Sequence, residues 1–489
     1  MKKYNIFRNI ALGALVVSSL SSCEDYLSLS NPNKTTVETF WTDLKDTKSG
    51  LYATYAALRN DYVLNIREEA WRSDLCWPGY GRPQPQNNAE GWNWYCQNYT
   101  NSTVAISSKW DALYISIWRA NQVIEALERI KDTVSGDEIE TWNNQMGHAR
   151  FIRGLMYFYN GSVVLRTSTA QSFNLPLSPA EDVLKFFRED LEVAYDLLPV
   201  PQDVTSDYEG LATKGTAATI QGISYLYEKE YSEAEMKFKD VIDNYGYELE
   251  QDWTKMFTNA GEFNSESILE ISYSLDYRQD ITTWDMNCMY NRLATLSTSL
   301  GGFLPAAWLV NEFLNDKPDN KDSRNTGRQV SLRASAMVAL VKDEVTPYYI
   351  NGNASEKCPM GGPLADWGFG KFKKYTNHDI VTKEKPSMSG KNVVVNRLSD
   401  VYLMYAECLL QRETPDIAGA LLYINKVRAR WGVELLGIEA EFAGIRTYDG
   451  ESYTKDELME HLMFVERPLE LATEGHQIRW QDLRRWGLL

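Results

Sequence analysis

The sequence predicts a mainly α-helical fold, in which antiparallel helix pairs stack into a tetratricopeptide-like α-α superhelix with large loop-rich insertions and a few short strands. Apolar residues from Leu398 to Leu409 recur at gaps of three and four, which places them on one helix face. A second helix follows at once, because Thr414 can cap it, Pro415 fits its first turn and Gly432 can end it. The pair is 34 residues long, the length of one tetratricopeptide unit. One pair cannot bury its own stripe, so it needs similar pairs beside it.

The rest of the chain supplies such helices. Ser178, Pro179 and Glu181 form the pattern of a capping box with proline at the first helical position. The apolar stripe that ends near Leu127 and the next one along the chain should pair with each other. Helices are expected at about 39–60, 110–127, 152–159, 179–198, 212–227 and 231–245.

Composition describes an ordinary globular chain with an unusual number of aromatic residues. The 489 residues are 44% hydrophobic and 24% charged, which excludes a disordered protein. Fifty basic against 67 acidic residues give a net charge of −17, which argues against nucleic acid as a partner. The 15 Trp and 29 Tyr are more than a helical core requires. Some of them should therefore face a ligand.

The N-terminus predicts export and lipidation. Residues 1–22 have a basic start, an apolar run and small residues, as in a secretory signal peptide. Leu20 to Cys23 resembles the bacterial lipobox, in which Cys23 becomes the lipidated first residue; a plain signal peptide is the alternative. Several acyl chains make a durable anchor. No later apolar run reaches the roughly 20 residues of a spanning helix.

Two stretches lose the helical period. Residues 71–99 contain Gly, Pro and many aromatic residues, which predicts a loop without helix, and 252–396 reads as a long irregular insertion with a short strand near Ser267. Cys76 and Cys96 bracket the aromatic part of the first stretch. A disulfide there would stabilise by about 3 kcal/mol, but reduced thiols are the open alternative. Cys408 is expected in the core.

Seven segments carry a recognisable pattern and follow one another nearly from end to end of the chain. They are the lipobox, Asn31-Pro32-Asn33, Phe40-Trp41, Trp110 to Asn121, His148 to Phe158, Arg397 to Gly432 and Glu466 to Gly487. This ordered set resembles the SusD/RagB family of outer-membrane nutrient-binding lipoproteins. Two departures stand out: Gln477 and Ile478 look inserted, and the chain stops at Leu489 where members continue, which leaves open whether its C-terminus is truncated.

The resemblance implies a helical scaffold with a variable, loop-rich ligand face. Members sit at the cell surface of the outer membrane as a lid over a SusC-like TonB-dependent barrel, to which they hand glycan or other nutrients. They are not enzymes, and neither a cofactor nor nucleic acid is expected as a partner. The implied boundaries are a signal peptide at 1–22, a lipidated tether at 23–38 and one domain at 39–489, with scaffold at 39–250 and 397–489 and ligand-face insertions at about 71–99 and 252–396.

Aromatic residues of the two insertions are the candidate ligand-binding residues, because sugar rings stack their C–H faces on flat aromatic rings and Asn, Asp or Arg bind their hydroxyls. For each ring the alternative is that it packs its own loop onto the scaffold. The candidates are Trp77, Trp92, Trp94, Tyr95, Asn98 and Arg72 in the first insertion, and Asp276, Trp284 and Tyr290 in the second.

Other chemistry-bearing residues have structural interpretations. Trp110, Trp118 and Tyr402 lie within helical patterns and are expected in the core. The four His show no metal-ligand spacing and no HExxH, so no metal site is expected. Catalytic carboxylates cannot be located from sequence, because their separation is three-dimensional. An ion-pair network, preferred over anion binding, is expected between Glu466, Glu470 and Glu474 and Arg479, Arg484 and Arg485.

Two functional hypotheses follow. The first is a lipid-anchored surface protein that binds oligo- or polysaccharide and delivers it to the barrel. The second is an adaptor or lid that binds no sugar, or binds a peptide, on the same transporter. A glycoside hydrolase is a distant third.

Overall fold

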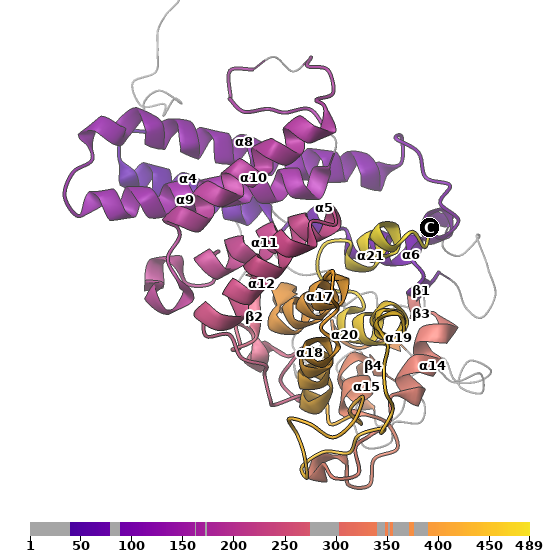
Figure 1. The fold of residues 1–489 in the computed structure, drawn as a ribbon. Coiled ribbons are helices and arrows are strands. Elements are labelled where there is room, and N and C mark those ends of the chain that lie inside the picture. The colour runs from indigo at the N-terminus through magenta and orange to yellow at the C-terminus, as the bar shows by residue number, and fades with distance from the viewer. Residues whose placement is uncertain are drawn as a thin grey trace, which may run out of the picture.

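Figure 1 shows the chain in a computed structural model, which describes residues 40–78, 89–161, 163–171, 174–273, 303–339, 348–350, 353–355, 371–375 and 390–489. Cys23 and the whole lipobox lie outside the described residues. So do Asp276, Trp284 and Tyr290, which were the candidates in the second insertion.

The architecture is mainly helical, as predicted. Figure 1 shows the N-terminal helices as one layer and the later pairs stacked beneath it. The helices are α4 (Leu44–Ala57), α5 (Asp61–Leu64), α6 (Ile66–Arg72), α7 (Ala89–Tyr95), α8 (Val104–Ile130), α9 (Glu138–Asn160), α10 (Ala180–Leu197), α11 (Lys214–Tyr227), α12 (Tyr231–Asn244), α14 (Ala307–Asn315), α15 (Leu332–Met337), α17 (Leu398–Gln411), α18 (Ile417–Arg430), α19 (Lys455–His461), α20 (Arg467–Leu471) and α21 (Ile478–Trp486).

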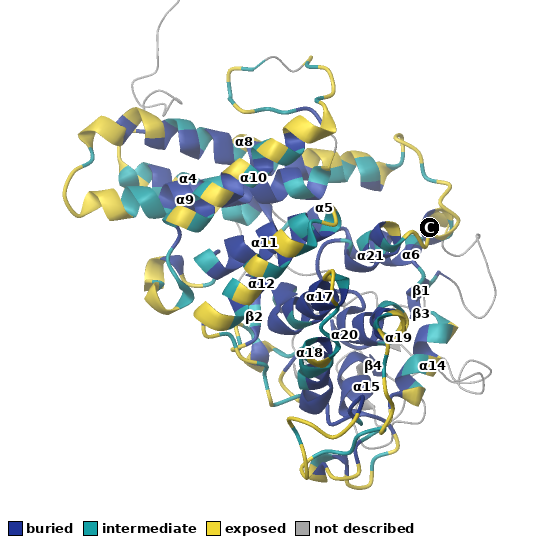
Figure 2. Cartoon of the chain, viewed as in Figure 1, coloured by how far each residue is buried: buried dark blue, intermediate teal, exposed yellow. Residues whose placement is uncertain are grey.

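The predicted helix pairs are present. α8 packs on α9, α11 on α12 and α17 on α18, and α12 contacts α17, so that one pair continues into the next. Most of α17 is buried in the middle of the molecule, as the dark blue ribbon in Figure 2 shows. Cys408 is buried there, as expected. The pair from which the fold was predicted therefore continues the stack from α12, with α17 in the interior of the molecule.

The helix caps differ from the sequence prediction at two places. Asp416, not Thr414, caps α18, because its Oδ1 accepts the Gly419 N–H at 2.9 Å. Ser178 does not cap α10; its Oγ accepts the Leu165 N–H at 3.0 Å and so ties down the preceding loop. Gly432 ends α18 as predicted, with a φ of +59° that favours glycine. Short polar side chains near a helix start compete for the cap, and packing decides between them.

Two tryptophans expected in the core are exposed. Trp110 and Trp118 on α8 are 41% and 40% exposed. The buried face of α8 contains Leu113 and Ile117. Trp110 is three residues before Leu113 and Trp118 is one residue after Ile117, so both side chains lie at the edge of that buried face. The prediction of a core role for these two tryptophans was therefore wrong, whereas Tyr402 is partly buried against the core.

Both insertions contain more regular structure than predicted. The first was expected to lack helix, yet α7 forms there with Gly91 buried inside it. The second contains α14 and α15 in addition to the expected strand. The strands form two-stranded antiparallel sheets: β1 (Cys76–Trp77) with β3 (Leu304–Pro305), β2 (Ser267–Ile271) with β8 (Val393–Arg397), β4 (Val338–Ala339) with β7 (Lys371–Phe372), and β5 (Tyr348–Ile350) with β6 (Asn353–Ser355). Strand β8 leads directly into α17.

The glutamates of the C-terminal segment are buried in an ion-pair network, but their partners differ from those predicted. Glu466 pairs with Arg333 and Arg428. Glu470 and Glu474 both pair with Arg397. The predicted partners are engaged elsewhere or exposed: Arg479 pairs with Asp74, Arg485 with Glu407, and Arg484 lies at the surface. These glutamates thus pair with arginines far away in sequence, whereas a separate ion pair between Arg467 and Asp482 joins α20 to the next helix.

Cys76 and Cys96 are free thiols, the first buried and the second exposed. Burial holds the pKa of the Cys76 thiol well above its usual range. The disulfide that the sequence left open is therefore not formed in this structure.

Candidate functional site

Three aromatic side chains of the first insertion form a cluster at the surface, which we call the aromatic cluster: Trp77 of β1 and Trp92 and Tyr95 of α7. The Tyr95 ring stacks on Trp92 with centroids 5.8 Å apart and meets Trp77 edge-on at 5.3 Å. Tyr95 is 38% exposed and the two tryptophans are half-buried. The cluster therefore presents ring surface to solvent while its members fix one another's orientation.

Local structure explains why these rings meet. Trp92 and Tyr95 are three residues apart on α7 and so share one helix face. Pairing of β1 with Leu304 and Pro305 of β3 holds Trp77 beside that face. Two elements of the first insertion and one of the second thus build the cluster.

Trp94 belongs to the opposite face of α7. It is only 2% exposed and stacks on Tyr99, with centroids 4.3 Å apart. A residue two positions after Trp92 is turned by about 200° around a helix with 3.6 residues per turn. The prediction that Trp94 binds ligand is therefore wrong, because no sugar ring can reach a buried indole.

Arg72 is bound within the protein. It forms an ion pair with Glu69 at 2.5 Å, donates to Oε1 of Gln477 at 3.1 Å, and lies 4.2 Å from the ring centroid of Trp480. These contacts join the end of α6 to the start of α21. Asn98 is exposed beside α7, and its N–H donates to the Asn93 carbonyl at 2.8 Å. A ligand contact by Asn98 stays a prediction.

Gln477 is a supporting residue that the sequence did not reveal as such. It adopts the left-handed conformation at the start of α21, with a φ of +57°. Its side chain bonds to Arg72 and to Gln481, at 3.1 and 3.0 Å. The apparent insertion at this position was its one signal in the sequence.

A buried polar group lies behind Arg72. Nζ of Lys109 contacts Nε2 of His476 at 3.0 Å and Oε1 of Glu69 at 3.3 Å, and His476 stacks on Tyr159. Burial, with the neighbouring Lys109 and Arg72 cations, holds the pKa of His476 well below its usual range. Burial also lowers the pKa of Lys109. This group links α8 to α6 and to the segment that precedes α21.

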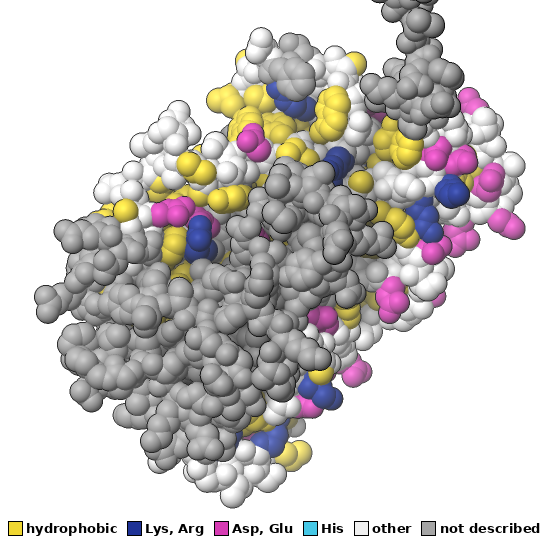
Figure 3. All heavy atoms as spheres, turned by 180° about the vertical axis from the view of Figure 1, so that it is seen from behind, with side chains coloured by type: hydrophobic (Ala, Val, Ile, Leu, Met, Phe, Trp, Pro, Cys, Tyr) yellow, Lys and Arg dark blue, Asp and Glu magenta, His cyan; other side chains and the backbone are white. Residues whose placement is uncertain are grey.

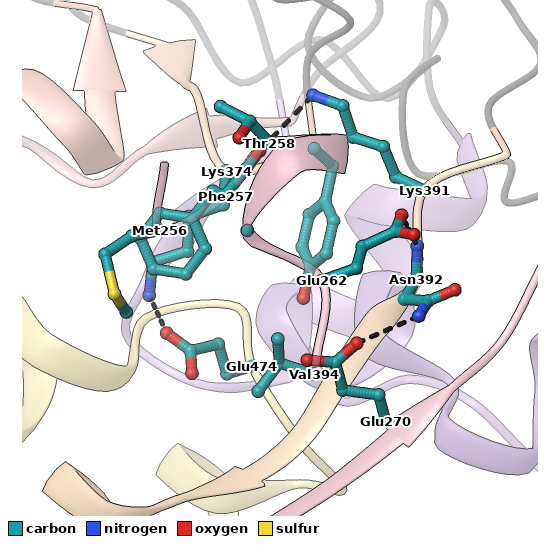
Figure 4. A pocket seen from close by; sticks show the side chains of 12 residues that line it. Met256, Phe257, Thr258, Glu262, Glu270, Lys374, Lys391, Asn392, Val394 and Glu474 are labelled. Carbon is teal, nitrogen blue, oxygen red and sulfur yellow. Dashed lines mark hydrogen bonds and ion pairs between the residues drawn. The ribbon is translucent and has the colours of Figure 1, made fainter. Parts of the chain in front are cut away.

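The cavity in Figure 4 is too small for a sugar. Its volume is about 20 Å³, enough for a water molecule. Lys374 ion-pairs with Glu474 at one side, and Asn392 donates to Glu270 at 2.9 Å at the other. Burial lowers the pKa of Lys374 to about 8. These polar side chains are thus paired with one another around a small interior cavity.

The described residues show neither a metal-binding group nor, on the face seen in Figure 3, a broad basic field. Seen from behind, Lys and Arg side chains of the described residues are scattered and form no broad basic field (Figure 3). Among these residues no group of three His, Cys, Asp or Glu is arranged to hold a metal. None of the helices that the structure describes is long and apolar enough to span a bilayer.

Two family models cover most of the chain. The model of the SusD family matches residues 265–488, and a model described as "Starch-binding associating with outer membrane" matches residues 25–222. The chain belongs to the SusD family. That family is carbohydrate-binding, and the description of the second model associates it with the outer membrane.

Relatives of the SusD family match over nearly the full length. SusD-like protein P25 of Formosa agariphila is 25% identical over 518 aligned positions, which cover 99% of this chain and 90% of that protein. A SusD homologue of Bacteroides thetaiotaomicron has a TM-score of 0.74 at 20% identity, over 94% of this chain and 89% of its own. A laminarin binding SusD-like protein has a TM-score of 0.68 at 21% identity, over 91% of each chain. The two structural likenesses establish the SusD fold for this chain.

Proposed function

We propose that this SusD-family protein is a surface-exposed lipoprotein that captures oligo- or polysaccharide and delivers it to a SusC-like TonB-dependent outer-membrane barrel. The aromatic cluster is the observation that carries the proposal, because it offers partly exposed, mutually fixed rings on the insertion face. Laminarin binding by a structural neighbour supports a glycan as the ligand class. Lipidation at Cys23 would tether the single domain from residue 39 onward to the membrane.

The cluster fits weak, reversible capture. Two or three ring stacks at about 1 kcal/mol each and a similar number of net hydrogen bonds sum to about 5 kcal/mol. That free energy corresponds to dissociation constants near millimolar. Weak binding suits a protein that must release its ligand to a pore.

Removal of the two α7 rings tests the site. Trp92→Ala with Tyr95→Ala should weaken binding of laminarin or soluble starch by about 30-fold, because two stacks are lost. The dissociation constant is measured by retardation in polysaccharide-containing native gels. Trp94→Phe is the matched control, since this neighbouring ring is buried and should leave binding unchanged. Unchanged retardation of the double variant would reject the aromatic cluster as the site.

Binding without catalysis is part of the proposal. Incubation with laminarin or starch should release no reducing sugar above the level of a boiled sample. Release that scales with protein concentration would replace the binding function by a hydrolase.

A further inference from the structure

A second, larger cleft lies between the loop that precedes α11 and strand β2. Its volume is about 470 Å³, within the roughly 300–1,000 Å³ of small-molecule sites. Figure 1 shows β2 well apart from β1, so this cleft is separate from the aromatic cluster. Its lining, all within the described part of the chain, consists of Pro201, Val204, Ser206, Glu209, Gly210, Leu211, Thr213, Tyr247, Phe263, Ser267, Ile268, Leu269 and Glu270.

Phe263 is the exposed ring of this cleft. It is 48% exposed and has a φ of +50°, a left-handed conformation that is unfavourable for a residue other than glycine. Its N–H donates to Oε1 of Glu270 at 3.0 Å, which helps to hold that backbone. Backbone strain of this kind often occurs at functional sites, so a strained residue with a large exposed apolar side chain suggests a functional role.

Gly210 lies directly against the Phe263 ring. A Cβ added at Gly210 would be 3.0 Å from Cζ of that ring, and the glycine itself has a φ of +76°. Only a residue without a side chain allows the ring to lie so close to the loop backbone. The ring is therefore held in place at the edge of the cleft.

The polar lining is acidic and hydroxylic. The hydroxyls of Thr213 and Tyr247 are 3.2 Å apart, and Ser206 and Ser267 add two more. Glu209 and Glu270 are the charged lining residues, and the lining includes neither Lys nor Arg. Burial raises the pKa of Glu270, whose carboxylate accepts from Asn392 on the side of the cavity in Figure 4. Such a lining repels anions and matches an uncharged ligand rich in hydroxyls.

We propose that this cleft is a second saccharide site, which binds a short segment of a neutral glycan with Phe263 as the stacking ring and the Ser206 and Tyr247 hydroxyls as hydrogen-bond partners. Only the class of ligand, a glycan, is taken from the proposed function. Its residues and its position are independent of the aromatic cluster.

Four proteins separate the two sites: the unmodified chain, Phe263→Asn, Trp92→Ala with Tyr95→Ala, and the triple variant. Asparagine tolerates the left-handed conformation, so the ring is removed without added backbone strain. Native gels containing laminarin or soluble starch report the dissociation constants. The Trp92/Tyr95 variant should keep a residual retardation, and the triple variant should lose it. Phe263→Tyr is the matched control; it keeps a ring and should bind like the unmodified chain, and thermal unfolding checks that each variant folds.

Each outcome decides between the two proposals. Residual retardation that persists in the triple variant overturns the second site. Complete loss already in the Trp92/Tyr95 variant also overturns it and leaves the proposed function intact. Loss in Phe263→Asn with full retention in the Trp92/Tyr95 variant supports the cleft and rejects the aromatic cluster. An unmodified chain that is retarded by neither polysaccharide counts against both.

Discussion

At the scale of single residues, the buried carboxylate of Glu470 links α20 to β8 and to the end of α18. It accepts from Arg397 at 2.5 Å and from Arg430 and Trp431 at 2.6 Å, and all four side chains are buried. Glu470→Gln removes the charge and leaves two buried arginines short of an anion, so we expect a loss of about 3–5 kcal/mol of unfolding free energy. Urea unfolding measures it.

The matched control is an exposed ion pair. Asp243 pairs with Lys239 at 2.6 Å on the surface of α12, and Asp243→Asn should change the unfolding free energy by no more than about 0.5 kcal/mol. Equal losses in the two variants would show that burial of the Glu470 network contributes nothing.

His148 makes stability depend on pH. It is buried between the hydroxyl of Tyr55, 2.8 Å from its Nδ1, and the stacked ring of Tyr208, and burial lowers its pKa from 6.5 to about 3. Between those values the unfolded chain binds the proton and the folded chain does not. The unfolding free energy should therefore fall as the pH decreases from 6.5, by up to about 1.4 kcal/mol per pH unit from this residue.

His148→Gln tests this dependence. His461 and His476 also have lowered pKa values because they are buried, so they keep part of the slope. The variant's curve of unfolding free energy between pH 6.5 and 5 should be flatter than that of the unmodified chain by about 1 kcal/mol per pH unit on average. Parallel curves would mean that the pKa of His148 is the same in the folded and the unfolded chain.

At the scale of elements, the helix pairs could be predicted because their apolar spacing reports one buried face. The caps could not: Thr414 and Asp416 are both good cap residues, and the tertiary position of α18 selects the second. The apolar spacing also placed Trp110 and Trp118 wrongly in the core. Positions at the edge of the buried face of α8 recur with the same helical period as positions in its centre, so spacing alone does not distinguish them. What periodicity predicts is the existence of an element, and packing settles its ends and edges.

The contact of α11 with α12 depends on a glycine. A Cβ added at Gly222 would lie 2.6 Å from Cε1 of the buried Phe238 ring. Gly222→Ala should destabilise by about 1–3 kcal/mol through overpacking, although alanine is the better helix former by about 1 kcal/mol. Urea unfolding of the single and double variants with Phe238→Leu measures it. The smaller side chain should relieve the clash, so strictly additive losses would contradict the close contact.

At the scale of the whole molecule, the site was only partly predictable. The concentration of aromatic residues in residues 71–99 indicated Trp92 and Tyr95, but only the α7 helix shows that Trp94 faces inward. The hydrogen-bond partners of the Glu470 carboxylate come from two distant segments, β8 and the end of α18, which no local spacing reveals. The second cleft is assembled from a loop, a turn and a strand spread over about 70 residues, so its parts carry no common motif.

The surface of α8 that fits the proposed barrel partner carries two exposed tryptophans with a partly buried tyrosine between them. Trp110, Tyr114 and Trp118 are spaced by four residues and so lie along one edge of the helix, and the Trp110 and Tyr114 rings are 4.5 Å apart. Large apolar side chains gathered at a surface mark interaction sites, and tryptophan dominates binding free energy at protein interfaces.

Trp110→Ser with Trp118→Ser should therefore reduce copurification with a SusC-like barrel by at least 30-fold, since interface tryptophans contribute about 1 kcal/mol or more each. Retardation by laminarin or starch should stay unchanged, because the aromatic cluster and the second cleft lie on other elements. Met236→Ser is the matched control, as an exposed apolar residue on α12 outside this edge. Equal copurification of all three proteins would place the barrel contact elsewhere, and a parallel loss of glycan binding would mean that α8 serves the ligand and not the partner.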